Sequence, residues 1–358
     1  MTTAESVSST PSRKDWKGYG RNLYRISCRK AMQHIDIREF LERAPDHGFP
    51  LDYLLSRLRG RRSRLITDWG ILAKSTSPME QLTPGHYQTV FGISAPDAAW
   101  RALMAEYRWG YHQMNGPVRK TFAPFFLYGE LRTLFICLRY LRGLMRDRLQ
   151  EILSVSLLSV AIRDALLRSS DELSAAQGIE KEFLCLSCRF KGLAETLRHA
   201  GLNDFEQKLA EIFLSVIITT GLDPFLKAFF LRIIDARNIL ALAKLLKLGE
   251  TLEHPFISGG KIDAVMLRDI LGRRDIQTAD KLVMGFTGEK TSSANLSGLE
   301  ISMYRGISRW LKKKSRGSPG TGLVLDYLWK CSVEAMNLNI LSYGAGLHRD
   351  VIAAELVR

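Results

Sequence analysis

The stretch Phe229–Gly249, FFLRIIDARNILALAKLLKLG, reads as one long helix that is apolar on nearly every side. A helix of this kind is buried over most of its surface. Gly249 stands where a helix end favours a left-handed residue. Asp235 and Asn238 are three residues apart and share one face, where a buried polar group without a partner costs about 1–3 kcal/mol. Arg232, one turn earlier, is the expected partner of Asp235.

The same arrangement returns in two other parts of the chain. Near the C-terminus Glu334 stands three residues before Asn337, and in the middle of the chain Glu130 is followed at the same spacing by Thr133. The copies are roughly a hundred residues apart, a distance that suits three multi-helix units rather than a short-period solenoid. These polar residues either form hydrogen bonds between helices inside each unit or line a binding pocket.

Composition and charge narrow the class of protein. A chain of 358 residues with 46% hydrophobic and 25% charged residues can bury a large core. Strand-like alternation is scarce, so the fold is predicted to be all-α. The net charge of +14 suggests an acidic partner, an anionic membrane surface or nucleic acid, although a solvated basic surface is equally compatible.

Periodicity and breakers give the expected helices and their limits. A basic helix is expected over residues 16–44 and a second helical stretch over 51–74. Pro124 is expected to break the chain before the helix that carries Glu130. Residues 151–200 are expected to hold two helices that divide near Gly178.

Motifs for metal or nucleotide chemistry are weak. Cys185 and Cys188 form a CxxC without a second pair, so they are interpreted as core cysteines rather than zinc ligands. Gly285–Ser293, GFTGEKTSS, resembles a phosphate loop, but Glu289 would face the phosphates. With no HExxH or nucleophile elbow, no catalytic residue, cofactor or metal is expected.

Cysteine spacing and hydropathy indicate the cellular compartment that is expected for this chain. Five cysteines without the spacing of a small secreted protein fit a reducing cytoplasm. No apolar run is seen to reach the ~18 residues that a membrane span requires. The chain is therefore expected to be soluble or peripheral.

Several segments, taken in order, resemble the C-subunit family of the V/A-type rotary ATPases, which is related to the d-subunit of the eukaryotic V-type enzymes. They are the Tyr-Gly helix with arginines that starts at Tyr19, DARNILALAKLLKLG (Asp235–Gly249), FISGGKI (Phe256–Ile262) and EAMNLNILSYGAGLHRDVI (Glu334–Ile352). Thr133, in place of Asn in the middle copy, departs from the family pattern.

The resemblance implies a non-catalytic central-stalk protein with three helical units around a pseudo-threefold axis, shaped as a funnel. The implied partners are the central shaft subunits, held in the pocket, and the membrane proteolipid ring. Torque would pass between them during proton or sodium transport linked to ATP hydrolysis or synthesis, without direct nucleotide binding. The chain would lie peripherally at the cytoplasmic face of the membrane.

The resemblance also suggests boundaries and equivalent residues. A tail over 1–15 would precede units over 16–124, 125–222 and 223–358, with room for interleaving that packs the terminal helices together. The implied equivalent residues, candidates for the repeat motif or the shaft pocket, are Glu130, Asp235, Asn238, Glu334 and Asn337. Two alternatives stay open: a basic helical scaffold that binds an acidic protein or nucleic acid, and an enzyme whose site the motif search missed. Nucleic acid is the less expected partner because no reader motif is present.

Overall fold

The computed structural model describes residues 36–75, 98–249, 255–318, 320–344 and 347–357. Within these ranges the chain forms helices and irregular segments, with an isolated β-bridge between Leu41 and Leu158 and no strand, so the all-α prediction is confirmed. The helices in chain order are η1 (Ile37–Phe40), α2 (Leu51–Arg62), α3 (Trp69–Lys74), α5 (Ala98–Gln113), α6 (Gly116–Arg142), α7 (Arg146–Val155), α8 (Val160–Arg168), α9 (Glu172–Leu184), η2 (Cys188–Phe190), α10 (Leu193–Ala200), α11 (Leu202–Ile217), α12 (Pro224–Leu248), α13 (Ala264–Arg273), α14 (Ile276–Thr287), α15 (Leu296–Lys314), η3 (Ser315–Gly317), α16 (Thr321–Tyr343) and α17 (Arg349–Glu355).

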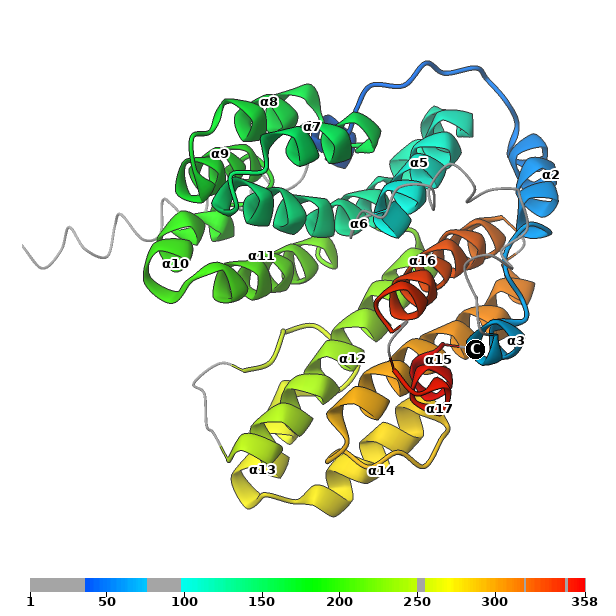
Figure 1. Cartoon of the computed structure of the whole chain (residues 1–358), viewed down its shortest axis with the longest axis vertical. Helices are drawn as coiled ribbons and strands as arrows, with labels where there is room; N and C mark the ends of the chain where they lie inside the picture. Colours follow the sequence, from blue (N-terminus) through cyan, green and yellow to red (C-terminus); the bar gives the residue numbers. More distant parts are fainter. Residues whose placement is uncertain (1–35, 76–97, 250–254, 319, 345–346, 358) are drawn as a thin grey trace, which may run out of the picture.

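Three long helices, α6, α12 and α16, organise the molecule (Figure 1). Helices α7, α9 and α11 pack against α6, and α13, α14 and α15 pack against α12. Around α16 lie α2 and α5 from the N-terminal part of the chain and α17 from the C-terminal part. Segments from opposite ends of the sequence therefore share one group of helices.

The three long helices meet through an aromatic cluster in their N-terminal halves. The ring centroids of Phe125 on α6 and Phe229 on α12 are 5.8 Å apart, and those of Phe229 and Trp329 on α16 are 5.6 Å apart. All three side chains are buried and belong to the main hydrophobic core. Aromatic side chains bury large apolar areas, so this cluster fixes the helices to one another.

Helix α12 is the long helix that the sequence predicts. It begins after Asp223, whose carboxylate accepts hydrogen bonds from the backbone N–H groups of Phe225 and Leu226 at 2.9 and 3.2 Å. It ends at Gly249, which adopts a left-handed conformation with φ of 71°. Both ends thus follow the usual capping chemistry of Asp and Gly.

Helix α6 differs from its prediction, because Pro124 lies inside it and does not break the chain. A proline in a helix interior costs about 3 kcal/mol. The helix begins before the proline, because the side chain of Asn115 accepts a hydrogen bond from the N–H of Val118 and caps the first turn. Burial of Phe125 and Phe126 directly after the proline offsets its cost.

Other boundaries also differ from the predictions. The helix expected over 16–44 lies partly outside the described residues, and within them only the short η1 is helical. The stretch expected over 51–74 divides into α2 and α3, because the backbone between them turns out to bind Glu334.

The two helices expected over 151–200 are replaced by the end of α7 and by α8, α9 and α10. Gly178 lies within α9, where a Cβ atom would come 3.0 Å from the Cβ atom of Ala165 on α8. The glycine therefore allows two helices to approach closely and does not end one.

Helix α6 is long and apolar enough to cross a membrane by length and composition, which corrects the expectation that no such stretch exists. Its most apolar window is 67% buried inside the fold. The core helix of a folded domain meets the same criteria.

Candidate partner-binding site

Asp235 and Asn238 on α12 bind the backbone of the non-helical segment that follows the helix. The side-chain amide of Asn238 donates to the carbonyl of Ile257 at 2.9 Å, and its oxygen accepts from the Ile257 N–H at 2.8 Å. The carboxylate of Asp235 accepts from the N–H of Ile262 at 3.0 Å. Burial raises the pKa of Asp235, while the backbone N–H groups of Ile262 and Lys261 oppose the rise.

Glu334 and Asn337 on α16 make equivalent contacts. Asn337 donates to the carbonyl of Val357 at 2.8 Å and accepts from its N–H at 2.9 Å. Glu334 accepts from the N–H of Ile66 at 2.7 Å. The acid of this copy therefore holds a segment from the N-terminal part of the chain, between α2 and α3.

Glu130 on α6 is the acidic residue of the third copy. It accepts from the backbone N–H of Leu157 and from the hydroxyl of Ser156, the latter at 2.9 Å. Thr133 accepts a hydrogen bond from the indole of Trp100 at 3.1 Å and does not clamp a backbone. Burial raises the pKa of Glu130 to about 6.

In this copy a neighbouring backbone takes the place of the missing Asn. The N–H of Glu42 donates to the carbonyl of Leu157 at 2.7 Å, and the N–H of Ser159 donates to the carbonyl of Phe40 at 2.9 Å. The extended segment after α7 is thereby held from its other side, which explains how threonine is accommodated.

The predicted site residues are thus brought into three matching environments, not into one cluster. Each is at most 4% exposed: Glu130, Asp235, Asn238, Glu334 and Asn337. Their partners are backbone groups of non-helical segments, not other helices as one reading of the sequence expected.

The expected pairing of Arg232 with Asp235 is wrong in detail. The Arg232 guanidinium donates to the carbonyl of Phe286 at 2.6 Å and lies 4.0 Å from the centroid of its ring. Arg232 does lie near Asp235, as the sequence indicates. The packing of α14 and α15 on α12 gives the guanidinium of Arg232 other hydrogen-bond acceptors.

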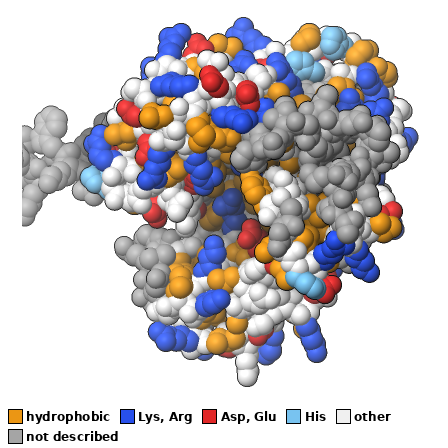
Figure 2. Space-filling view, viewed as in Figure 1, with side chains coloured by type: hydrophobic (Ala, Val, Ile, Leu, Met, Phe, Trp, Pro, Cys, Tyr) orange, Lys and Arg blue, Asp and Glu red, His pale blue; other side chains and the backbone are white. Residues whose placement is uncertain are grey.

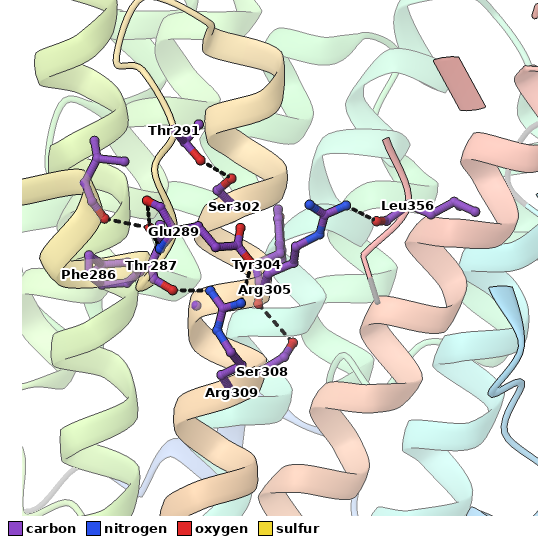
Figure 3. A network of polar contacts seen from close by, with 12 residues as sticks. Phe286, Thr287, Glu289, Thr291, Ser302, Tyr304, Arg305, Ser308, Arg309 and Leu356 are labelled. Carbon is purple, nitrogen blue, oxygen red and sulfur yellow. Dashed lines mark hydrogen bonds and ion pairs between the residues drawn. The ribbon is translucent and has the colours of Figure 1, made fainter. Parts of the chain in front are cut away.

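The stretch that resembles a phosphate loop has a structural role (Figure 3). Gly288 ends α14 in a left-handed conformation, so the glycine follows a helix and does not precede one. Arg309 on α15 donates to the carbonyl of Thr287 and pairs with Glu289. A phosphate site would need free N–H groups at a helix N-terminus, which this arrangement does not offer.

Figure 3 also shows that Arg305 on α15 reaches the C-terminal segment, where it donates to the carbonyl of Leu356 at 2.7 Å.

The cysteines and possible metal ligands give no site. Cys185 and Cys188 are exposed, so their interpretation as core cysteines is wrong; Leu186 and Phe190 occupy the core positions of this turn. Among the residues that the structure describes, no group of three or more His, Cys, Asp and Glu side chains could hold a metal ion.

The molecule is hollowed between the part formed by α7–α11 and the part formed by α12–α15 (Figure 2). Charged side chains are visible inside the hollow. Among the arginines of the long helices, Arg132 stands two residues after Glu130, and Arg237 stands two residues after Asp235. Because the acids face inward to the non-helical segments, residues two positions on point to a different side of each helix.

The surroundings of Arg132 and Arg237 place them where several helices converge. The electrostatic neighbours of Arg132 include Tyr304 on α15 and Tyr343 on α16, and its guanidinium lies 4.9 Å from the ring centroid of Trp100. Its side chain is exposed, and desolvation by the surrounding atoms lowers its pKa.

Arg237 lies beside α6 and faces α11. It donates to the hydroxyl of Tyr128 on α6 at 3.5 Å, and this phenol raises the pKa of Arg237. Tyr304 and Glu211 are its further neighbours. The sequence analysis missed both arginines; their equal offset from the two acids was the signal that could have found them.

In comparisons with known proteins, the sequence matches no model of a protein family and no curated protein.

Proposed function

We propose that this chain is a non-catalytic central-stalk component of a V/A-type rotary ATPase, which couples the rotating shaft to the membrane proteolipid ring. The proposal rests on one interaction that occurs three times in the structure. Glu130, Asp235 and Glu334 each lie on a long buried helix and accept a hydrogen bond from a backbone N–H of a non-helical segment. The sequence resemblance to the C-subunit family rests on these same helices.

A pseudo-threefold funnel is the finer part of this proposal. Phe125, Phe229 and Trp329 stand five or six residues before the three acids, and Phe229 contacts both of the other rings in the core. Three helices that meet at equivalent positions in one half and diverge in the other would form a socket. The narrow end of the shaft would occupy this socket.

Such a socket transmits torque if its walls are stiff. The clamps of Asn238 on Ile257 and of Asn337 on Val357 use both polar functions of each amide inside the core. Buried, fully satisfied polar networks rigidify a fold. The proposed role requires no chemistry from the chain itself, only rigidity and two partner surfaces.

Exposed leucines at the ends of the long helices offer a surface for the proteolipid ring. Leu144, Leu248 and Leu347 follow the three acids by 13 or 14 residues and are 80%, 64% and 59% exposed. Val160, Val265 and Val351 are exposed in the first turns of α8, α13 and α17. Exposed apolar groups at equivalent places suit contact with a partner built from repeated copies.

The test is purification of the tagged chain from native membranes, with identification of the proteins that accompany it. We expect shaft subunits and the proteolipid of a rotary ATPase, at stoichiometric amounts. Recovery of neither partner from membranes that contain the assembled ATPase would overturn the proposal.

The second candidate is a basic scaffold that binds an acidic protein or nucleic acid outside any rotary complex. It is favoured by the exposed run Lys312–Lys314 and by Arg316, at the end of α15. Retention of nucleic acid that falls steeply with salt, without ATPase subunits, would support this candidate in place of the first.

A further inference from the structure

A row of aromatic rings and guanidinium groups runs along the flank of α2 that faces α5 (Figure 1). The ring centroids of Phe49 and Tyr53 are 4.4 Å apart, and the guanidinium carbon of Arg57 lies 5.7 Å from the centroid of Tyr53. The guanidinium carbons of Arg57 and Arg61 lie 5.4 and 3.7 Å from the ring centroid of Trp109 on α5. These distances are those of cation–π contacts, and we call the five residues the stacked row.

The stacked row lies at the surface. Helix α2 turns its leucines towards the core and packs against α16. On its other side Tyr53 is 38% exposed and the side chain of Arg57 is exposed, while Phe49 and Trp109 are half-buried. The row thus offers aromatic and guanidinium groups to a partner without any change in the core.

The loop before α2 holds the aromatic end of the row in place. The side-chain amide of Asn115 donates to the carbonyl of Phe49 at 2.9 Å. The carboxylate of Asp46 accepts from the N–H of Gly116 at 2.7 Å. A ligand would meet groups that are already ordered, which lowers the entropic cost of binding.

Charge is divided along this flank. Arg57 and Arg64 are exposed and form no ion pair with any other residue that the structure describes. The chain keeps a helical turn after α2, so Arg64, seven residues after Arg57, lies near the same side of the helix. At the other end of the flank, Asp46 and Asp52 are exposed acids. One end of the row is therefore basic, and the aromatic end has acidic neighbours.

We propose that the stacked row binds an extended acidic segment of a protein partner. Its carboxylates pair with Arg57 and Arg64, and its proline or aromatic side chains cover Phe49 and Tyr53. Guanidinium groups bind carboxylates through paired hydrogen bonds, and aromatic surfaces accept extended proline-containing segments. The inference goes beyond the proposed function, because it requires neither the shaft nor the proteolipid ring.

The division of charge favours a protein segment over nucleic acid. Single-stranded nucleic acid also stacks on aromatic rings, but it carries a phosphate at every nucleotide. Such a strand would bring negative charge to Asp46 and Asp52 at the aromatic end of the row. A protein segment that is acidic in one half and uncharged in the other avoids this repulsion.

The experiment measures the fluorescence anisotropy of a labelled peptide, with one Glu-rich half and one half rich in Pro and Tyr, during titration with the full chain. R57Q/R64Q is compared with R59Q/R268Q, which removes the same charge from two other exposed arginines. Arg59 follows Arg57 by two residues and lies on another side of α2, and Arg268 lies on α13. We expect R57Q/R64Q to bind at least tenfold more weakly, and the control to stay within twofold of the natural chain.

A second pair of variants tests the rings without a change of charge. Tyr53→Leu removes the ring, and we expect it to bind the peptide at least fivefold more weakly. Tyr53→Phe keeps the ring and should stay within twofold of the natural chain. Unfolding midpoints are measured for all variants, and the Tyr53 pair decides the test if R57Q/R64Q changes the fold.

The outcomes separate this inference from the proposed function. The inference is overturned if the natural chain does not bind the peptide, or if R57Q/R64Q binds it as tightly as the control does. Tighter binding of a labelled single-stranded oligonucleotide than of the peptide also overturns it, because the row would then be a nucleic-acid site. Peptide binding that depends on Arg57, Arg64 and Tyr53 supports the inference whether or not the chain co-purifies with shaft and ring subunits, which tests the rotary role alone.

Discussion

At the scale of single residues, Asn238 and Asn337 act as substitutes for a strand partner. Each offers one donor and one acceptor to a single residue, Ile257 or Val357, in the pattern that two paired backbones would use. The partner residues are themselves buried, so water cannot replace the bonds. An alanine at either position would leave two buried backbone groups unsatisfied.

We therefore expect Asn238→Ala to lower the free energy of unfolding by about 2 to 6 kcal/mol, measured by urea denaturation, because each of the two backbone groups left without a partner costs about 1–3 kcal/mol. Asn203→Ala, at an exposed position of α11, is the control and should stay within about 0.5 kcal/mol. Equal stability of the two variants would contradict the clamp.

Glu130 differs from the asparagines because it titrates. Burial raises its pKa from 4.5 to about 6. Between these two values the folded chain binds more protons than the unfolded chain, so the contribution of Glu130 to stability falls as pH rises.

A comparison with Glu130→Gln isolates this effect, because glutamine keeps an acceptor for Leu157 and does not titrate. We expect the stability of the natural chain relative to the variant to fall by about 2 kcal/mol between pH 4 and pH 7, since one pKa unit corresponds to about 1.4 kcal/mol. The measurement is the difference in unfolding free energy at each pH; a difference that rises with pH would show that the carboxylate is stabilised and not penalised by its site.

At the scale of elements, each long helix is matched to a non-helical segment that must come close to it. Gly260 shows the fit most clearly: a Cβ atom there would lie 2.4 Å from Oδ1 of Asp235 and 3.0 Å from Cγ2 of Ile234. The acid on α12 and the glycine in the segment are thus required together.

Gly260→Ala should therefore destabilise the chain by about 1–3 kcal/mol, the usual cost of overpacking a core. Gly272→Ala is the matched control, because it lies in α13 with no atom within 4 Å of the added Cβ. Alanine favours a helix over glycine, so we expect the control to gain up to about 1 kcal/mol. Thermal unfolding of both variants checks the pair, and a tolerated Gly260→Ala would argue against close contact of segment and helix.

At the scale of the whole molecule, the three copies differ in where their segments come from. Those bound by Glu130 and Asp235 follow their helices in the chain, whereas Glu334 holds Ile66 from the N-terminal part. The phenol of Tyr107 on α5 also donates to the carbonyl of Leu328 on α16 at 3.2 Å. The two ends of the chain thereby complete one unit together.

The exposed leucines at the ends of the long helices allow a test of the proposed ring contact. We expect the triple substitution of Leu144, Leu248 and Leu347 by Ser to leave the unfolding midpoint nearly unchanged, because these side chains are mostly exposed. Retention on membranes that contain the proteolipid ring should fall at least tenfold, since apolar contacts dominate the cores of stable interfaces.

The control for this variant is the triple substitution of Ile71, Leu184 and Met284 by Ser, which are exposed on α3, α9 and α14 and do not belong to the long helices. Retention is measured as the fraction that sediments with the membranes. Equal losses of membrane retention in both variants would contradict a contact between the ring and the helix ends.

The sequence by itself determined the all-α class, the long helix α12 with its caps, and the presence of buried acid and amide groups in need of partners. These features follow from local chemistry: the apolar period, Asp223 before the helix, Gly249 after it and the spacing of Asp235 and Asn238. Such signals act over a few residues and can be read along the chain.

Only the tertiary structure decided which groups meet. The partner of Glu334 lies 268 residues away, a distance over which no periodicity carries information. Pro124 is tolerated within α6 because the side chains after it are buried, and Arg132 and Arg237 are basic residues like many others until the fold brings both of them near Tyr304. Packing and long-range hydrogen bonding depend on the whole fold, and local propensity does not encode them.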